Sequence, residues 1–184
     1  CDKVIVDDFD SAVNATQYLI DTNCKKIALF STIHNLSVGE LRENGYREAL
    51  QNNNINFNKS ITLLLDSDVG FDEKMSQIIL DEKPDAIFAI DEYAVVTAMK
   101  FCLKNGLHVP DDVSIIGFAD GLWSRRMTPS LSTISQHAPE IGQKTAELII
   151  KRIEEIPDSE SEKIFETAVI KTELRKRDSV RKLF

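Results

Sequence analysis

Acidic side chains recur directly after short apolar runs in this 184-residue chain. Such runs predict β-strands, and open α/β sheets bind their ligands outside the carboxyl ends of the strands. Carboxylates at that edge can accept paired hydrogen bonds from sugar hydroxyls or nucleoside groups, and an arginine offers a rigid fork of donors. The polar residues expected to meet at this rim are Asp7, Asp8, Ser31 to Ser37, Asp66 to Asp68, Asp91 and Asp120, with Arg42 as the donor fork.

The elements that would position these residues alternate between strand and helix patterns. Between the strands, apolar residues recur at helical spacing, and we expect the first helix to begin at an N-cap formed by Asp10 or Ser11. This alternation predicts an α/β fold, a parallel doubly wound sheet flanked by helices on both faces. The apolar runs that predict its strands lie at 4–6, 26–30, 61–65, 86–90 and 113–118.

The stretch 106–120, GLHVPDDVSIIGFAD, ends one helix and opens a buried strand. Gly106 suits a left-handed helix stop, and Pro110 keeps the helix from restarting. The run from Val113 to Phe118 lacks polar alternation, which is typical of a parallel strand covered on both faces. Ala119 and Asp120 are therefore expected at the exit of this strand.

The pattern changes after Asp120. Residues 121–129 are expected to be irregular, and 131–135 to form a short extended segment. An apolar stripe from Ile141 to Ile153 predicts a longer helix, with Pro139 in its first turn. An acidic loop at 156–162 and a last strand at 164–170, paired at a sheet edge, would follow.

Composition narrows the class of protein. A net charge of −8 and a pI near 4.9 argue against a general polyanion-binding surface. The sequence has no helix-turn-helix pattern, no apolar run of membrane-spanning length and no signal-peptide pattern at its start. Three widely spaced cysteines favour free thiols in a reducing cytoplasm over a disulfide framework. Basic residues gather near the end, where a solvated terminus is favoured over a nucleic-acid contact: Arg175, Lys176, Arg177, Arg181 and Lys182.

Motifs for catalysis and for cofactors are absent from the sequence. There is no G-x-x-x-x-G-K-[ST] loop, no G-x-G-x-x-G after a strand and no G-x-S-x-G elbow. Zinc-ligand spacing is also missing, and His34 stands in a loop without a second histidine or cysteine nearby. We therefore expect no metal and no cofactor, and an enzyme is the least favoured of the classes considered.

Several motifs together resemble the ligand-sensing domain of LacI/GalR (lactose-repressor-type) bacterial transcriptional regulators. The stretch 106–120 resembles the family's strand that ends in Gly-Phe/Tyr-Asp-Asp. Residues 42–50, RENGYREAL, are similar to its R-x-x-G-Y/F-x-x-A-L helix, and 84–94 to its P-D-A-I-F-A-x-D-x-x-A strand and helix start. Residues 6–28 and 129–146 add further matching pieces in the same order, so the resemblance covers nearly the whole chain.

The resemblance implies a periplasmic-binding-protein-like type I lobe with a partial second lobe. On this interpretation residues 1–184 are an effector-binding region, 121–140 partly cross to the other lobe, and the N-terminal DNA-binding domain and most of the first lobe are absent. The implied function is that of a cytoplasmic, homodimeric repressor with no membrane association. It would bind a small sugar-like effector and thereby control its binding to operator DNA. The alternative is a periplasmic sugar-binding protein of a transporter; the free cysteines and the family-like ending at 174–180 favour the regulator.

The same resemblance ranks the candidate ligand-binding residues. Arg42 matches the family's effector-binding arginine, and the alternative is a solvent-facing helix residue. Asp10 resembles an acidic position that faces the ligand, Asp91 matches an acid that borders the pocket, and Asp120 matches the second acid of the Gly-Phe-Asp-Asp signature. From spacing alone, Asp10 and Asp91 are better interpreted as helix N-caps.

Two positions depart from the family pattern. Ala119 stands where the first acid of the signature is expected, and Ile90 stands where family members often have asparagine. Apolar groups thus replace hydrogen-bonding groups, so we expect an effector that is less hydroxylated or that is held by other rim residues. Trp123, the only tryptophan, has three candidate roles: stacking on a ligand, anchoring a subunit interface, or packing in the core.

Overall fold

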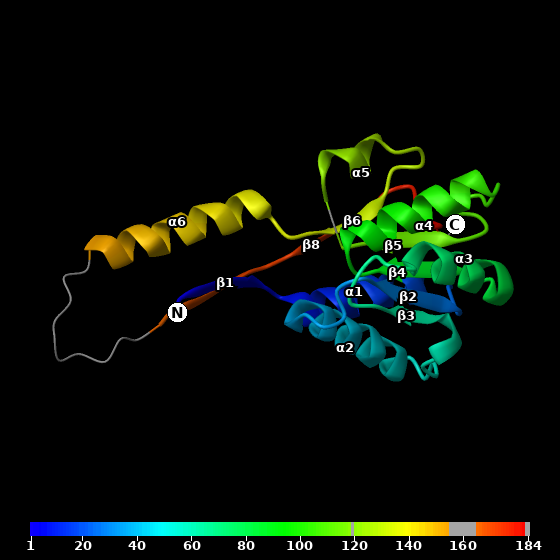
Figure 1. Cartoon of the computed structure of the whole chain (residues 1–184), viewed down its shortest axis with the longest axis horizontal. Helices are drawn as coiled ribbons and strands as arrows, with labels where there is room; N and C mark the ends of the chain where they lie inside the picture. Colours follow the sequence, from blue (N-terminus) through cyan, green and yellow to red (C-terminus); the bar gives the residue numbers. More distant parts are fainter. Residues whose placement is uncertain (119, 155–164, 183–184) are drawn as a thin grey trace.

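A six-stranded sheet with the order β3-β2-β4-β5-β6-β8 is the centre of the main body (Figure 1). The computed structural model describes residues 1–118, 120–154 and 165–182. Strands β2, β3, β4, β5 and β6 pair in parallel, and β8 pairs with β6 in the antiparallel direction. The strands are β2 (Ile27–Ser31), β3 (Thr62–Leu64), β4 (Ala86–Ala89), β5 (Ser114–Gly117), β6 (Ser132–Ser135) and β8 (Glu173–Arg175). The predicted α/β fold with a parallel, helix-flanked sheet is confirmed.

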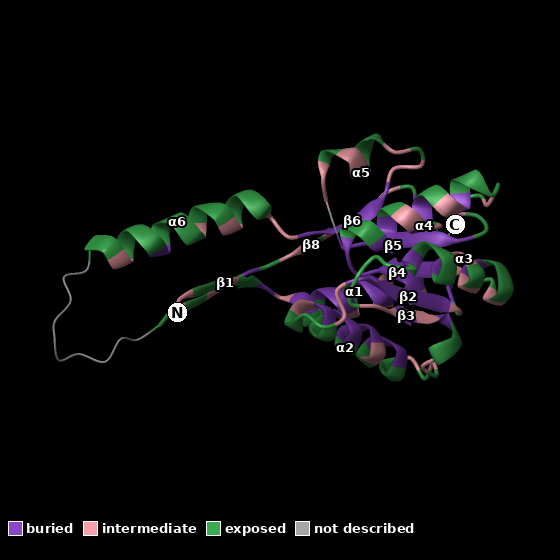
Figure 2. Cartoon of the chain, in the orientation of Figure 1, coloured by how far each residue is buried: buried purple, intermediate pink, exposed green. Residues whose placement is uncertain are grey.

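Helices cover both faces of this sheet. One core layer joins the sheet to α1 (Asp8–Asp21) and α2 (Ser37–Asn52), and the other joins it to α3 (Phe71–Glu82) and α4 (Glu92–Lys104). Strands β2, β4, β5 and β6 are buried along their whole length, as Figure 2 shows. The mainly apolar character of β2, β4 and β5 follows from this two-sided burial, whereas the buried hydroxyl groups of β6 accept or donate hydrogen bonds. A short 3-10 helix, η1 (Lys59–Ile61), precedes β3.

The Gly-Tyr pair in α2 explains how closely α1 and α2 pack. A Cβ placed on Gly45 would meet the carbonyl oxygen of Phe9 and would lie 2.8 Å from the Cβ of Ala12. Tyr46, which is fully buried, donates its hydroxyl to the carbonyl of Ile27 at 2.7 Å. These two residues therefore seat α2 against α1 and against the sheet.

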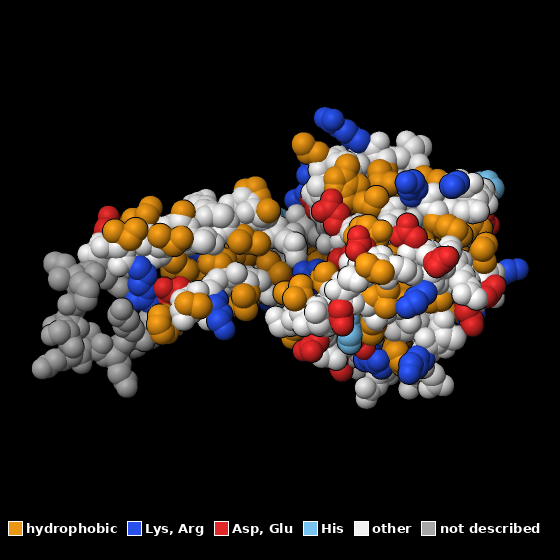
Figure 3. Space-filling model, viewed as in Figure 1, with side chains coloured by type: hydrophobic (Ala, Val, Ile, Leu, Met, Phe, Trp, Pro, Cys, Tyr) orange, Lys and Arg blue, Asp and Glu red, His pale blue; other side chains and the backbone are white. Residues whose placement is uncertain are grey.

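A second, smaller unit extends away from the main body (Figure 1). It consists of a two-stranded parallel sheet, β1 (Lys3–Val6) with β7 (Thr167–Ile170), and of the long helix α6 (Ala138–Glu154). Asp2 holds this unit together, because Arg152 donates to both of its carboxylate oxygens at 2.7 Å. Hydrophobic side chains gather along α6 and β1 on the face drawn in Figure 3, and Ile149 and Ile153 are 56% and 77% exposed.

The chain leaves the main body between β6 and α6, near the end of the stretch 121–140 that was expected to cross partly to the other lobe. Residues 121–135 stay in the main body, since they form α5 (Leu122–Arg126) and then β6. The segments that leave it are β1, α6 and β7. The expected irregular stretch 121–129 thus contains a short helix, and the expected acidic loop at 156–162 lies outside the described residues.

Two of the connections between the main body and this smaller unit are bound to each other. Asp7, which follows β1, accepts a hydrogen bond from the backbone N–H of Thr172 at 2.8 Å, and Lys171 lies 3.2 Å from the same carboxylate. The hydroxyls of Ser11 and Thr172 are 2.5 Å apart. Helix α1 begins at Asp8, so the expected N-cap at Asp10 or Ser11 is wrong: Asp7 is the N-cap residue.

The end of the chain is not the solvated terminus that the sequence indicated. Arg177 donates to Asp120, to Thr133 and to the carbonyl of Leu131. Ser179 and Val180 are buried, with 0% and 1% of their surface exposed. The last strand, β8, was not expected, and it ties this end to β6. Charged residues so close in sequence suggested a solvent-facing tail. The sheet edge supplies partners for Arg175 and Arg177, whereas Lys176 and Lys182 are exposed.

The helix stop at Gly106 is confirmed. Helix α4 ends at Lys104, and Gly106 has a φ of +73°, in the left-handed region that favours glycine. Strand β5 follows at Ser114. None of the helices in the described ranges combines the length and the apolar character that a membrane span needs.

Candidate ligand-binding site

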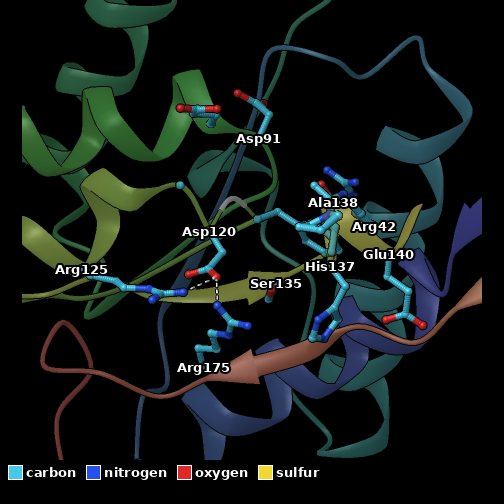
Figure 4. A pocket seen from close by; sticks show the side chains of 14 residues that line it. Arg42, Asp91, Asp120, Arg125, Ser135, His137, Ala138, Glu140 and Arg175 are labelled. Atoms are coloured by element: carbon cyan, nitrogen blue, oxygen red, sulfur yellow. Dashed lines mark hydrogen bonds and ion pairs between the residues drawn. The ribbon is translucent and has the colours of Figure 1, made fainter. Parts of the chain in front are cut away.

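A cavity of about 710 Å³ lies at the carboxyl ends of β4, β5 and β6. This is the edge at which parallel sheets of this kind bind ligands. The wall of the cavity combines residues of the main body with the first turn of α6. It is lined by Arg42, Asp91, Glu92, Phe118, Asp120, Gly121, Arg125, Ser135, Gln136, His137, Ala138, Pro139, Glu140 and Arg175 (Figure 4).

Arg42 is held on three sides at this wall. Its Nε and Nη2 both lie 2.7 Å from Oδ1 of Asp8, and its Nη1 donates to the carbonyl of Ile90 at 2.7 Å. Its guanidinium carbon lies 3.6 Å from the centroid of the Phe118 ring, a cation–π contact. Arg42 is only 5% exposed, so the alternative of a solvent-facing helix residue is wrong.

Burial controls the protonation of this ion pair. It raises the pKa of the Asp8 carboxyl, although Arg42 opposes this shift, and it lowers the pKa of the Arg42 guanidinium. Both directions disfavour the charged forms, because burial removes the two charges from water. Burial of this pair therefore costs free energy, and the pair holds the Arg42 guanidinium in place at the cavity wall.

Asp91 is both a helix cap and a part of the wall. Its Oδ1 accepts from the backbone N–H of Ala94 at 2.8 Å, so it caps α4 as its spacing predicted. Its Oδ2 accepts from the backbone N–H of Thr32 at 2.7 Å, and the Thr32 hydroxyl lies 3.1 Å from Oδ1. The ends of β2 and β4 are thereby joined through one carboxylate.

Asp120 is the centre of a cluster of arginines. Its Oδ1 accepts from Arg177 at 2.6 Å and from the Thr133 hydroxyl at 2.9 Å. Its Oδ2 accepts from Arg175, and Arg125 lies 3.8 Å from the same oxygen, as the dashed lines in Figure 4 show. Burial raises the pKa of Asp120, but these hydrogen bonds and charges lower it more, to below its ordinary range.

The structure does not bring every predicted residue to the cavity. Asp10 lies on the outer side of α1, with its side chain 63% exposed and 3.6 Å from Lys171. Asp66 and Asp68 are exposed after β3, at the far edge of the sheet. His34 lies beside Glu43 in α2 rather than at the wall. The cavity lies at the carboxyl ends of β4, β5 and β6, and from the part of the chain between β2 and β4 only Arg42 lines it.

Several lining residues escaped the sequence interpretation. Arg125 comes from α5 and Arg175 from β8, two elements that the sequence did not predict. The segment Ser135 to Glu140, which connects β6 to α6, supplies another part of the wall. The pair Arg125-Arg126, shortly after Asp120, was the available signal, because two cations follow an acid at the end of a strand.

Three further residues were singled out in the sequence: Trp123, Ile90 and Ala119. Trp123 packs against the core layer of α3 and α4 and donates its indole N–H to Glu92 at 2.9 Å, so the core-packing alternative is confirmed. Ile90 has a fully buried side chain, and its carbonyl is the group that accepts from Arg42. Ala119 lies outside the described residues.

The arrangement is suited to holding a polar molecule. Arginine forks, a serine, a glutamine and a histidine face the same space as two glutamates and the ring of Phe118. In the described part of the chain, no group of three or more His, Cys, Asp or Glu side chains is placed to hold a metal ion. The cavity is thus best described as a candidate binding site.

Comparison with known proteins identifies the family. The model of the periplasmic binding protein-like domain matches residues 16–180. The chain is 31% identical over 183 residues to the probable HTH-type transcriptional repressor ExuR of Bacillus subtilis, covering 98% of this chain and 54% of that protein. It is 33% identical over 178 residues to the HTH-type transcriptional repressor PurR of Histophilus somni, covering 95% of this chain and 52% of that protein.

Solved structures agree with this assignment. A LacI family transcriptional regulator from Enterococcus faecium with bound ribose matches with a TM-score of 0.86 and 26% identity, over 100% of this chain and 67% of that one. A transcriptional regulator CelR–cellobiose complex matches with a TM-score of 0.83 and 25% identity, over 97% and 54% of the two chains. The chain spans about half the length of the curated relatives it matches. It belongs to the periplasmic-binding-protein-like domain family, in the form that LacI/GalR regulators use as their effector-binding domain.

Proposed function

We propose that the intact protein is a LacI-type transcriptional repressor whose DNA binding is controlled by a small effector, a sugar or a related metabolite, bound in the cavity described above. The observation that carries this proposal is the polar cavity of about 710 Å³ at the ends of β4, β5 and β6. The relatives support it, because they are named as repressors and regulators rather than as enzymes. Ribose and cellobiose are bound to two of the structural relatives.

The make-up of the wall suggests how binding would be transmitted. Arg42, Asp91 and Asp120 belong to the main body, whereas Ala138 and Glu140 belong to the first turn of α6, which extends away from it. A ligand that contacts both sides has a different affinity for each relative orientation of the two parts. It therefore shifts the equilibrium between these orientations, which is the requirement for an allosteric effector.

The partners of the intact protein form part of the same proposal. Operator DNA would be bound by a headpiece outside this chain, since the body carries a net charge of −8 and lacks a helix-turn-helix pattern. Most of the first lobe would likewise lie outside it. We further propose a homodimer in the cytoplasm, as the family resemblance implies. The relatives favour this regulator over the periplasmic transport protein.

The decisive measurement is whether a ligand of this protein changes its affinity for operator DNA. A library of sugars, sugar derivatives, nucleosides and nucleobases is screened by thermal shift, because a ligand at a hundred times its dissociation constant adds roughly 2.7 kcal/mol of stability. Each hit is then tested for a change in operator binding by the intact protein, and light scattering gives the oligomeric state. Hits that stabilise the protein but leave DNA binding unchanged would contradict the regulatory function.

Arg42 provides the residue-level test. Arg42→Ala removes a donor fork from the wall, and we expect effector affinity to fall about tenfold or more at temperatures where the variant is folded. Arg47→Ala is the control. Arg47 lies five residues further along α2, its side chain is 41% exposed, and it pairs with Glu43 rather than with Asp8. Equal effector affinity of the two variants would show that Arg42 does not contribute to effector binding.

A further inference from the structure

One end of the cavity carries two arginines whose charges are not fully matched. Arg125 projects from α5 and Arg175 from β8, and both converge on Asp120 (Figure 4). Asp120 is already paired with Arg177, which donates to its Oδ1 at 2.6 Å and does not line the cavity. Asp120 is thus shared by three guanidinium groups. Glu173 also pairs with Arg175, at 3.1 Å, and Glu92 lines the cavity, so Arg125 is the arginine that has no closely paired carboxylate of its own within the described residues.

Arg125 is the more available of the two. Its side chain is 57% exposed, and within the described residues its one ion-pair partner is Asp120, at 3.8 Å. Arg175 donates from Nη1 to Asp120 and from Nε to Glu173 at 3.1 Å, and among the described residues its Nη2 has no hydrogen-bond partner. Glu173 is 55% exposed, so water screens its charge. Both arginines therefore have donors that a ligand can use.

Two of the carboxylates near this end, those of Asp120 and Asp91, already accept hydrogen bonds from the protein. Oδ1 of Asp120 accepts from Arg177 and Thr133, and Oδ2 accepts from Arg175. Both oxygens of Asp91 accept hydrogen bonds, from Thr32 and Ala94. A neutral sugar would need such oxygens as acceptors for its hydroxyl protons. The α5–β8 end of the cavity instead offers donors, which suits a group that accepts hydrogen bonds and carries negative charge.

The other side of the cavity has a different character. Glu140 projects from the start of α6, across the cavity from Arg125 (Figure 4). In the described residues no side-chain partner is recorded for its carboxylate, so it can accept from hydroxyl groups. Ser135 and Gln136 lie on the wall nearby in sequence. A ligand that satisfies both sides has hydroxyl groups at one end and an anion at the other.

We propose that the effector is a hydroxylated compound with an anionic group, a carboxylate or a phosphate, and that Arg125 and Arg175 bind this group while Asp120 positions them. This inference rests on the proposed function of the cavity and narrows its ligand class to sugar acids and sugar phosphates. The planar guanidinium fork matches the paired oxygens of either group.

Matched pairs of compounds test the charge requirement. The intact protein is assayed by thermal shift and calorimetry at constant ionic strength with D-glucose, D-glucuronate and D-glucose 6-phosphate, with the three corresponding D-galactose compounds, and with inorganic phosphate. We expect at least one charged compound to bind ten times or more tightly than its neutral parent. Preference for the uronate over the phosphate ester, or the reverse, identifies the anionic group.

Arg125→Gln is the principal variant. Because the Arg125 side chain is exposed, we expect this substitution to leave the fold intact. It should weaken binding of the preferred anion about tenfold and leave the neutral parent within roughly twofold. Arg175→Gln should act in the same direction but also loosens Asp120. Arg126→Gln is the control, since Arg126 is an exposed neighbour on α5 that does not line the cavity.

Three outcomes overturn the inference: neutral compounds that bind as well as their charged partners, an absence of stabilisation by any of the anions, or anion binding that survives Arg125→Gln. These outcomes differ from failure of the proposed function. A neutral metabolite that releases the operator would leave the repressor function standing and remove only the anionic effector.

Discussion

Asp8 and Arg42 form an ion pair that is almost completely removed from solvent. Their side chains are 4% and 6% exposed, and both Nε and Nη2 of Arg42 lie 2.7 Å from the same oxygen of Asp8. The pair joins the first turn of α1 to α2, at the wall of the cavity. Its energetics follow from burial, since each charge depends on the other for compensation.

Removing only one member of this pair should be costly. Arg42→Ala leaves the Asp8 carboxylate buried without its cation, and we expect a loss of about 3–5 kcal/mol in the free energy of unfolding. The double variant Asp8→Leu with Arg42→Met removes both charges and should lose less than Asp8→Leu or Arg42→Met alone. Urea unfolding of the wild type, these two single variants and the double variant measures the cycle. Strictly additive losses would show that the two residues do not stabilise each other.

Asp91 should contribute to stability in two ways, as the N-cap of α4 and as the acceptor for Thr32. Asp91→Ala removes the acceptor for Ala94 at the start of α4 and also the acceptor for Thr32, and we expect a loss of about 2–3 kcal/mol. Asp91→Asn keeps one carbonyl oxygen for the cap and should lose about half as much. Thermal unfolding ranks the variants. If Asn were as damaging as Ala, charge rather than capping would be the stabilising property.

The ionisation of Asp120 should make the stability of the folded protein depend on pH at low pH. Its folded-state pKa is lowered, so its contribution is complete above its ordinary value of 3.8 and is lost as the pH falls below that value. Asp120→Asn should cost about 2 kcal/mol at pH 7 and should flatten the decline in stability between about pH 5 and pH 2. Urea unfolding across this range gives both quantities.

A surface aspartate serves as the comparison for Asp120. Asp10→Asn, at a side chain that is 63% exposed, should change stability by less than about 0.5 kcal/mol at neutral pH. An acid-induced decline of equal slope in wild type and Asp120→Asn would assign that decline to other carboxyl groups, such as Asp7, whose pKa is also lowered by the hydrogen bond from Thr172 despite its burial.

Two glycines in helices should respond to alanine in opposite directions. Gly45→Ala places a methyl group against Phe9 and Ala12 and should destabilise the protein by about 1–3 kcal/mol, because α1 and α2 must move apart. Gly142→Ala, in α6, meets no atom within 4 Å and should stabilise by about 0.5–1 kcal/mol through lower backbone entropy. Chemical unfolding of both variants gives the sign, and equal signs would refute the close-packing argument.

Local patterns predicted most strands of the main sheet, although the run at 4–6 became β1, which pairs with β7 in a separate sheet. The apolar runs at 26–30, 86–90 and 113–118 became β2, β4 and β5, because parallel strands buried on both faces are mainly apolar. Gly106 indicated the end of α4 because a positive φ favours glycine. Strand β8 was missed, because three residues at an antiparallel edge carry little pattern of their own.

Residue types and order along the chain alone determined the fold class, the strand ends at which Asp91 and Asp120 lie, and the choice of Arg42 as a candidate. Tertiary structure decided which of these groups share one cavity. Asp10 faces outward, whereas Arg125 and Arg175 come together at Asp120 from 50 residues apart in sequence. Such a meeting depends on strand order and on the path of the chain between the two parts of the molecule, and neither is encoded in any short stretch of residues.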